Sequence, residues 1–294
     1  MSQDWLIRFA EQRVGDPRII RLIRKWLKAG VLEDGVVNVS DRGTGQGAVI
    51  SPLLANIYLH YTLDLWAVRW RQREATGDMI FVRYADDFIV GFQHDRDACR
   101  FLDEMRERLG KFALSLHPEK TRLMEFGRFA AERRQRRELG RPETFNFLGF
   151  TFICGKSRRG KFLIQRKTRR DRMRSKLKEI KQALRRRMHQ DIPAQGKWLV
   201  QVVKGYFNYH AVPTNRHTLV VFRDEVTQAW RRTLSRRSQK GYIAWEQMKS
   251  IAEAWLPKPK ILHLWPRQRF DVRHPRWEPY AGKPHVRFCA GGAQ

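Results

Sequence analysis

The sequence has few cysteines, no long hydrophobic run and few acidic residues in its second half. Three cysteines, Cys99, Cys154 and Cys289, stand far apart among 294 residues and form no CxxC or zinc-finger pattern. This sparse use of cysteine is typical of a reducing cytosol, and we expect buried free thiols. No apolar run approaches membrane-spanning length, and no basic segment followed by an apolar core comes after Met1. We therefore expect a cytoplasmic protein without a signal peptide or a transmembrane segment.

Acidic residues become scarce after Gly127. The whole chain has 59 Lys and Arg against 30 Asp and Glu, a net charge of +29. Residues 1–127 hold 19 basic and 18 acidic side chains, a net of +1, whereas residues 128–294 hold 40 and 12, a net of +28. A surplus confined to one half is the electrostatic pattern of a protein that binds a phosphate backbone. An arginine-rich solvated surface is the alternative.

A run of apolar residues from Ile80 to Phe92, IFVRYADDFIVGF, is interrupted by two adjacent acids, Asp86 and Asp87. The run predicts two strands that fold back on a tight turn, with the acids at its tip. Neighbouring carboxylates repel each other and resist desolvation, so they need a cation or open water. Mg²⁺ suits such a pair because it takes oxygen ligands and is often held by one or two carboxylates plus substrate phosphates. A solvent-facing turn without a metal is the alternative.

The tetrapeptide Tyr84-Ala85-Asp86-Asp87, with its apolar flanks, resembles the catalytic motif of group II intron reverse transcriptase/maturases. The resemblance implies an RNA-directed DNA polymerase that uses Mg²⁺ and dNTPs on an RNA template and a DNA primer. It implies that Asp86 is a catalytic metal ligand and that Asp87 is an adjacent ligand or orienting group. Tyr84 and Ala85 are expected to lie against the primer end and the incoming sugar.

The block from Gly43 to His60 precedes this hairpin and resembles the glutamine-glycine loop and supporting helix of the same family. Carried over, Gln46 and Gly47 would line the nucleotide pocket. Ser51-Pro52 is expected to cap the helix that follows, and Asn56 would lie on that helix. Taken alone, a glycine-rich loop before a helix is as consistent with a simple turn as with a nucleotide cradle.

Two segments after the hairpin also resemble family blocks. Leu114 to Thr121 is expected to be extended, and Lys120 could lie near the triphosphate, because a flexible ammonium suits a pyrophosphate leaving group. A surface lysine paired with Glu119 is the alternative. Phe145 to Phe152, FNFLGFTF, resembles the primer-grip hairpin, which implies primer contacts at Leu148 and Gly149; by composition alone it is a buried strand pair.

Periodic apolar residues predict the remaining elements. Two amphipathic helices open the chain, and Asp16-Pro17 starts the second of them. We expect a strand or hairpin over residues 32–40 and a loop or exposed helix over residues 128–141. Further helices are predicted over residues 94–110, 169–189 and 243–255, and over residues 219–230 with basic residues up to Arg237 at the end. Residues 198–209 combine aliphatic and aromatic side chains.

The second half resembles the thumb, or maturase-specific domain, of group II intron proteins, notably across Gly205-Tyr206-Phe207-Asn208-Tyr209 and residues 234–239. The resemblance implies binding to intron RNA and to the template–primer duplex. Phe222 and Trp230 could stack on bases, but their helical spacing favours the core. RNA contacts are expected at a set of basic residues in and around the predicted helices: Arg169, Arg170, Lys176, Arg185, Arg186, Arg187, Arg236 and Arg237.

We therefore predict an α+β fold. A truncated polymerase palm, an antiparallel sheet with packed helices, is expected over residues 1–155. A mostly α-helical basic thumb or maturase domain is expected over residues 156–240, and a C-terminal helix with an irregular basic tail over residues 241–294.

The metal site implied by the resemblance needs one more carboxylate. In such palms it comes from a strand just before the first helices, and neither Asp4 nor Asp16 matches it. We therefore expect little polymerase activity from this chain alone, unless a separate chain or an upstream segment supplies that strand and the fingers. Two functions stay open: a group II intron reverse transcriptase that also assists splicing, and a non-catalytic RNA-binding maturase or truncated remnant.

Overall fold

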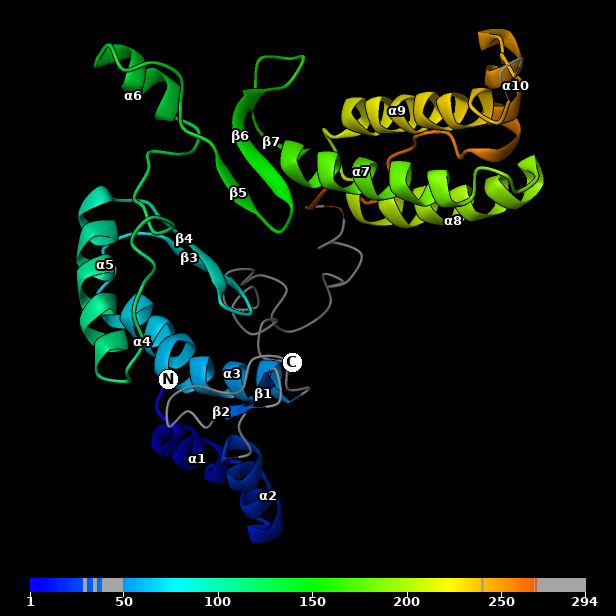
Figure 1. Cartoon of the computed structure of the whole chain (residues 1–294). Helices are drawn as coiled ribbons and strands as arrows, with labels where there is room; N and C mark the ends of the chain where they lie inside the picture. Colours follow the sequence, from blue (N-terminus) through cyan, green and yellow to red (C-terminus); the bar gives the residue numbers. More distant parts are fainter. Residues whose placement is uncertain (29–30, 34–35, 39–49, 239–240, 267, 269–294) are drawn as a thin grey trace. The chain divides into compact units, whose positions relative to one another are not determined.

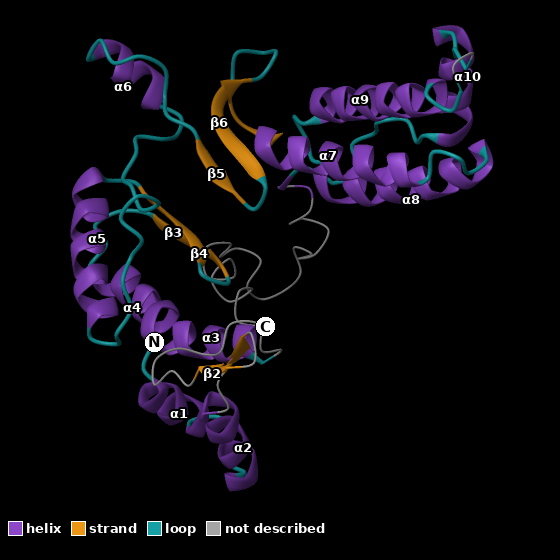
Figure 2. Ribbon diagram, viewed as in Figure 1, coloured by secondary structure: helices purple, strands orange, loops and turns teal. Residues whose placement is uncertain are grey.

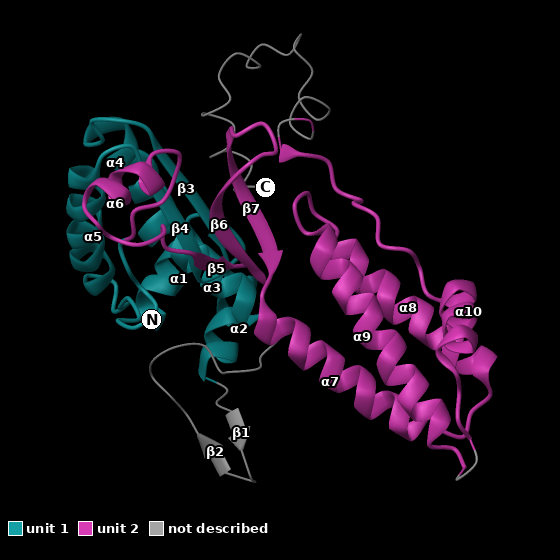
Figure 3. Ribbon diagram, turned by 90° about the horizontal axis from the view of Figure 1, so that it is seen from above, with its two compact units in different colours: residues 1–123, 279–294 teal, residues 124–278 magenta. Residues whose placement is uncertain are grey.

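The computed structural model describes residues 1–28, 31–33, 36–38, 50–238, 241–266 and 268. The chain divides into two compact units, residues 1–123 with 279–294 and residues 124–278, which Figure 3 colours separately. Each unit combines helices with antiparallel strands (Figures 1 and 2). The predicted α+β fold, with a strand-and-helix part followed by a mainly helical part, is confirmed. No helix in the described ranges is both long and apolar enough to cross a bilayer.

The first unit opens with the two predicted helices, α1 (Gln3–Glu11) and α2 (Pro17–Lys28). The carboxylate of Asp16 accepts a hydrogen bond from the Arg18 backbone N–H at 2.8 Å, which confirms the predicted start of α2. The predicted hairpin follows as β1 (Val31–Glu33) and β2 (Val36–Asn38), paired antiparallel. One row of apolar residues on α2 enters the core, whereas the neighbouring row, Ile19, Leu22 and Trp26, is exposed.

The next helical segment is interrupted by a π-helical turn that the sequence did not predict. It runs through α3 (Ser51–Leu59), the π-helix η1 (His60–Asp64) and α4 (Leu65–Arg73). The expectation that Ser51 caps α3 was wrong, because Ile50 occupies the N-cap position. Its backbone is already helical (φ −84°, ψ −16°), whereas a capping side chain needs an extended residue there.

The predicted hairpin with the two acids at its tip is confirmed as β3 (Met79–Tyr84) and β4 (Asp87–Phe92). Helix α5 (Asp95–Gly110) follows, and its buried Phe101 and Met105 pack with Trp70 of α4 in the core beneath the hairpin. The prediction of buried thiols was wrong for Cys99, which is exposed. Phe101 is two residues further along α5, about 200° around the helix, so Cys99 points away from the core. Cys289 lies outside the described residues.

The second unit begins with the short exposed helix α6 (Ala130–Arg136), as expected, and a three-stranded antiparallel sheet. The strands are β5 (Phe145–Phe147), β6 (Phe150–Lys156) and β7 (Phe162–Thr168), in that order. Strand β7 was not predicted, because its sequence FLIQRKT does not alternate between apolar and polar residues and its pairing with β6 decides its conformation. The boundary proposed between residues 155 and 156 falls at the end of β6 and stays a prediction about functional regions.

Four helices complete this unit: α7 (Arg170–Arg186), α8 (Ile192–His210), α9 (Arg216–Ser235) and α10 (Trp245–Trp255). Phe222 and Trp230 are fully buried among them, so the core interpretation of these two aromatics is confirmed. Helix α7 ends three residues before the predicted His189. The amide of Gln195 on α8 donates to the carbonyl of Arg187 at 2.6 Å, and so binds the backbone where the helix ends.

Candidate active site and nucleic-acid interface

The two acids of the hairpin lie at an exposed two-residue turn. Tyr84 pairs with Asp87 across the hairpin, which leaves Ala85 and Asp86 as the turn residues. All four residues are exposed, and Tyr84 is 65% exposed. Ala85 has a positive φ of 53°, a conformation that non-glycine residues rarely adopt. The turn thus presents two carboxylates and an aromatic ring to solvent on a short, strained backbone.

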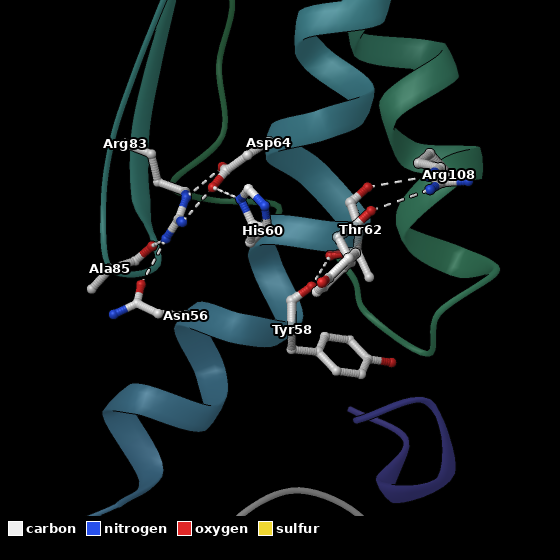
Figure 4. Close-up of polar contacts among 9 residues, drawn as sticks. Asn56, Tyr58, His60, Thr62, Asp64, Arg83, Ala85 and Arg108 are labelled. Atoms are coloured by element: carbon white, nitrogen blue, oxygen red, sulfur yellow. Dashed lines mark hydrogen bonds and ion pairs between the residues drawn. The ribbon is translucent and has the colours of Figure 1, made fainter. Parts of the chain in front are cut away.

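A partly buried arginine connects this turn to the helical segment that carries Asn56 and Asp64 (Figure 4). Arg83, the residue before Tyr84, donates from Nε and Nη2 to the two carboxylate oxygens of Asp64, at 2.7 and 2.6 Å. Its Nη1 donates to the Ala85 carbonyl at 2.7 Å and to Oδ1 of Asn56 at 2.9 Å. Only 12% of the Arg83 side chain is exposed. One guanidinium therefore joins α3, η1 and the turn.

The π-helix η1 that carries Asp64 is itself supported from α5. Nε of Arg108 donates to the carbonyl of Thr62 at 3.1 Å, and Nη2 donates to the carbonyl of Tyr61 at 3.4 Å (Figure 4). The hydroxyl of Thr62 donates to the carbonyl of Tyr58 at 2.9 Å. Burial, and secondly the charge of Arg69, lower the pKa of Arg108. These bonds satisfy backbone carbonyls at the π-helical turn, where the regular α-helical pattern is broken.

Asp86 and Asp87 fit part of a Mg²⁺ site. Adjacent exposed carboxylates can supply oxygen ligands to a hard cation that also binds substrate phosphates. The carboxylate of Asp64 forms an ion pair with Arg83. Within the described ranges, no group of three or more His, Cys, Asp or Glu side chains could hold a metal ion. The described turn therefore supplies two carboxylate ligands, both from the same side of a bound cation.

The other predicted nucleotide contacts in this unit are placed differently. Gln46 and Gly47 lie outside the described residues. Asn56 lies on α3, as expected, and its side chain accepts from Arg83. Lys120 is exposed, and its backbone N–H donates to the His117 carbonyl at 3.3 Å. Residues 118–120 therefore form a turn, whereas residues 114–117 of the segment predicted to be extended do not.

The predicted primer-grip residues form the tight turn between β5 and β6. Leu148 and Gly149 both have positive φ, at 46° and 76°, as a two-residue hairpin turn of the I′ type requires. The hydroxyl of Tyr209 on α8 donates to the Leu148 carbonyl at 2.9 Å, and its ring stacks on Phe150 with the centroids 5.7 Å apart. This turn belongs to the second unit and is held by the aromatic end of α8.

The predicted RNA contacts fall into two groups. Arg170, Arg185, Arg186 and Arg236 are exposed at helix surfaces or ends. The others have partners within the protein. Arg169 pairs with the carboxylate of Asp171, and Lys176 pairs with the carboxylate of Glu179. The guanidinium of Arg187 lies over the Trp198 ring, and Arg237 donates to the Gln190 carbonyl. The first group is available for phosphate contacts without breaking an existing bond.

Sequence reasoning missed Arg83, Asp64 and Arg108 as parts of this site. A charged residue inside the apolar strand at Arg83 was visible, and so was Asp64 in an otherwise apolar helical stretch. Such residues need a buried partner. Their pairing depends on how the helix and the hairpin pack.

Comparison with known proteins agrees with the motif. A family model described as reverse transcriptase (RNA-dependent DNA polymerase) matches residues 2–152, just over half of the chain. Protein YkfC of Escherichia coli is 29% identical over 191 residues, which cover 54% of this chain and 45% of that protein.

Two intron-associated proteins are also similar. The group II intron-encoded protein LtrA of Lactococcus lactis subsp. cremoris is 26% identical over 173 residues, 40% of this chain and 29% of LtrA. An uncharacterised 91 kDa protein in the cob intron of Schizosaccharomyces pombe is 47% identical over 60 residues, 20% of this chain and 7% of that protein.

The chain thus spans less than half the length of these relatives. Membership of the matched family implies a divalent-metal-dependent polymerase in general. With the YADD turn and its hairpin in place, the chain belongs to the reverse transcriptase (RNA-dependent DNA polymerase) family and is similar to group II intron-encoded proteins.

Proposed function

We propose that this chain carries the catalytic turn and the RNA-binding helices of a group II intron reverse transcriptase that also assists splicing. The observation that carries the proposal is the exposed Asp86-Asp87 turn on a hairpin anchored by Arg83, within a segment that matches the reverse transcriptase family. LtrA is named as a group II intron-encoded protein, which supports the assignment to an intron.

The proposed reaction joins a dNTP to a primer 3′-hydroxyl on an RNA template. Asp86 and Asp87 would hold Mg²⁺ through carboxylate oxygens. When bound, Mg²⁺ would stabilise the attacking and leaving oxygens of the displacement. The exposed ring of Tyr84 offers a flat apolar surface to the primer end, and the small side chain of Ala85 leaves room for the incoming sugar.

The basic second half supports a separate RNA-binding role. Its surplus of 28 positive charges, and the exposed arginines of α7 and α9, suit a phosphate backbone. The proposed partners are intron RNA and the template–primer duplex. The proposal includes a cytoplasmic location for this protein.

A second candidate function is a non-catalytic RNA-binding maturase. It is favoured by one observation: among the residues that the structure describes, no third carboxylate joins Asp86 and Asp87. The polymerase reading needs a further ligand, which a separate chain or an upstream segment could supply together with the fingers.

Primer extension on an RNA template with Mg²⁺ tests the proposal. We expect little extension by this chain alone, and extension when a polypeptide that supplies the further carboxylate ligand is added. Asp86→Asn should abolish that extension, whereas Asp103→Asn, on the exposed side of α5, should not change it. Failure of the supplemented chain to extend, with intact RNA binding, would favour the maturase reading. Robust extension by the chain alone would contradict the need for a further ligand.

A further inference from the structure

The catalytic turn is held by a side chain just outside the YADD motif. We propose that Arg83 is a positioning residue: oriented by Asp64, its guanidinium holds the Ala85 carbonyl and thereby sets the direction of the Asp86 carboxylate. This inference deepens the proposed polymerase function and rests on it. Arg83 itself touches neither substrate nor metal in this assignment.

All three nitrogens of the Arg83 guanidinium donate hydrogen bonds. Asp64 takes Nε and Nη2, at 2.7 and 2.6 Å, which is the bidentate arrangement that fixes the plane of an arginine. The remaining nitrogen, Nη1, is then directed at the Ala85 carbonyl, 2.7 Å away, and at Asn56 Oδ1, 2.9 Å away. A lysine could not make these contacts together, because its single ammonium lacks the fork.

The backbone at Ala85 needs such support. A left-handed conformation is unfavourable for a non-glycine residue, and the φ of Ala85 is 53°. The Ala85 carbonyl lies in the same planar peptide as the N and Cα atoms of Asp86. Fixing that oxygen therefore fixes the plane from which the Asp86 side chain departs. The four residues of the turn, Tyr84 to Asp87, are exposed.

Asp64, which accepts from Arg83, lies in the π-helix η1. One π-helical turn adds a residue to the helix, which rotates every later position by about 100° relative to a regular α-helix. Asp64 is the last residue of η1, so the wider turn contributes to the direction of its carboxylate. Because Arg108 binds the carbonyls of Tyr61 and Thr62, the break in the helical pattern is maintained from α5. A continuous series of contacts thus runs from α5 to the turn (Figure 4).

Nitrogen-15 relaxation of the Ala85, Asp86 and Asp87 amides in the full chain tests the inference. We expect order parameters of about 0.85 in the wild type and below about 0.6 in Arg83→Gln. Arg106→Gln, which removes an exposed α5 arginine paired with Asp103, is the matched control and should leave the turn ordered. If Arg83→Gln does not fold, Arg83→Lys retains a cation beside Asp64 but lacks the fork, and should also lower the order of the turn.

A charge swap separates positioning from simple stability. The double variant Asp64→Arg with Arg83→Asp restores an ion pair, but Asp at position 83 cannot donate to the Ala85 carbonyl. We expect the unfolding midpoint of the double variant to be closer to that of the wild type than the midpoint of Arg83→Gln is. The amide order parameters of the turn should nevertheless stay low. An ordered turn in Arg83→Gln, in Arg83→Lys or in the swap would overturn the inference.

Paramagnetic Mn²⁺, used in place of Mg²⁺, tests the underlying function independently. Mn²⁺ should broaden the Asp86 and Asp87 resonances before others in the first unit. With a polypeptide present that supplies the further carboxylate, a wild-type turn that is ordered but not broadened would contradict metal binding, and with it the polymerase proposal. The loss of order in the Arg83 variants would be unaffected by that result, so the two failures can be told apart.

Discussion

Arg83 and Asp64 form a bidentate ion pair, with N–O distances of 2.7 and 2.6 Å, that joins the strand before the YADD turn to the π-helical turn below it. The two side chains are 12% and 22% exposed, so the pair is largely shielded from solvent. A shielded pair that also serves two further acceptors is expected to stabilise the fold more than a surface ion pair does. It links the stability of the first unit to the geometry of the turn.

The first prediction concerns this pair. Asp64→Asn should lower the free energy of unfolding by about 1–3 kcal/mol, because it removes a charged hydrogen-bond partner from a partly buried guanidinium. Chemical denaturation followed by tryptophan fluorescence measures the change. Asp103→Asn, which removes an exposed partner of Arg106, should cost less than about 0.5 kcal/mol. Equal effects of the two substitutions would contradict the importance of burial.

The second prediction concerns RNA binding. Arg185→Glu with Arg186→Glu reverses two exposed charges at the end of α7 and should weaken binding to structured RNA. The log–log slope of affinity against salt should fall in magnitude by roughly 1.4–1.8, because two phosphate contacts are lost. Fluorescence anisotropy over a salt series measures both effects.

Two matched variants control this experiment. Arg185→Lys with Arg186→Lys keeps the charge and should retain most of the affinity, since phosphate attraction depends mainly on charge. Asp86→Ala should leave binding unchanged, because Asp86 lies in the other unit. A wild-type salt slope in the glutamate variant would place the RNA contacts elsewhere.

The third prediction compares two glycines of α8. A Cβ at Gly196 would lie 2.4 Å from Cδ2 of Trp255, whereas a Cβ at Gly205 would meet nothing within 4 Å. Gly196→Ala should therefore destabilise the second unit by about 1–3 kcal/mol, through overpacking against the indole. Gly205→Ala should stabilise it by about 0.5–1 kcal/mol, because alanine favours the helix. Thermal unfolding measures both, and shifts of the same sign would contradict the close approach of α8 to Trp255.

The fourth prediction is a pH dependence of stability. Burial lowers the pKa of His210 to about 4 from its ordinary 6.5, so its ring stays neutral in the fold where an unfolded chain would bind a proton. The ring packs on Tyr206 and Phe150, and its Nδ1 lies 3.3 Å from the Thr168 hydroxyl. The stability supplied by the folded, neutral histidine should be present above about pH 6.5 and decrease as the pH falls toward 4.

Denaturation at several pH values measures this effect. His210→Gln should flatten the profile between pH 6.5 and 4, because the substituted side chain does not titrate. His217→Gln, which replaces an exposed histidine on α9, is the matched control and should keep the wild-type profile. A profile that is unchanged by His210→Gln would show that another group dominates in this range.

Local sequence was sufficient for several features. The apolar runs on both sides of Asp86 and Asp87 predicted their hairpin, because strand propensity and turn chemistry act over a few residues. The spacing of Phe222 and Trp230 predicted their burial. A count of charged residues was enough to show the excess of basic residues after Gly127.

Tertiary packing decided the rest. The sequence offered two apolar rows on α2, and contacts with other elements decided which row is buried. Strand β7 exists because β6 pairs with it, although its own residues are largely polar or basic. The π-helical turn, and the pairing of Arg83 with Asp64 across 19 positions, follow from how the helix meets the hairpin. Such long-range pairings depend on packing geometry, which local propensity does not encode, and they orient the two acids that the sequence alone had already singled out.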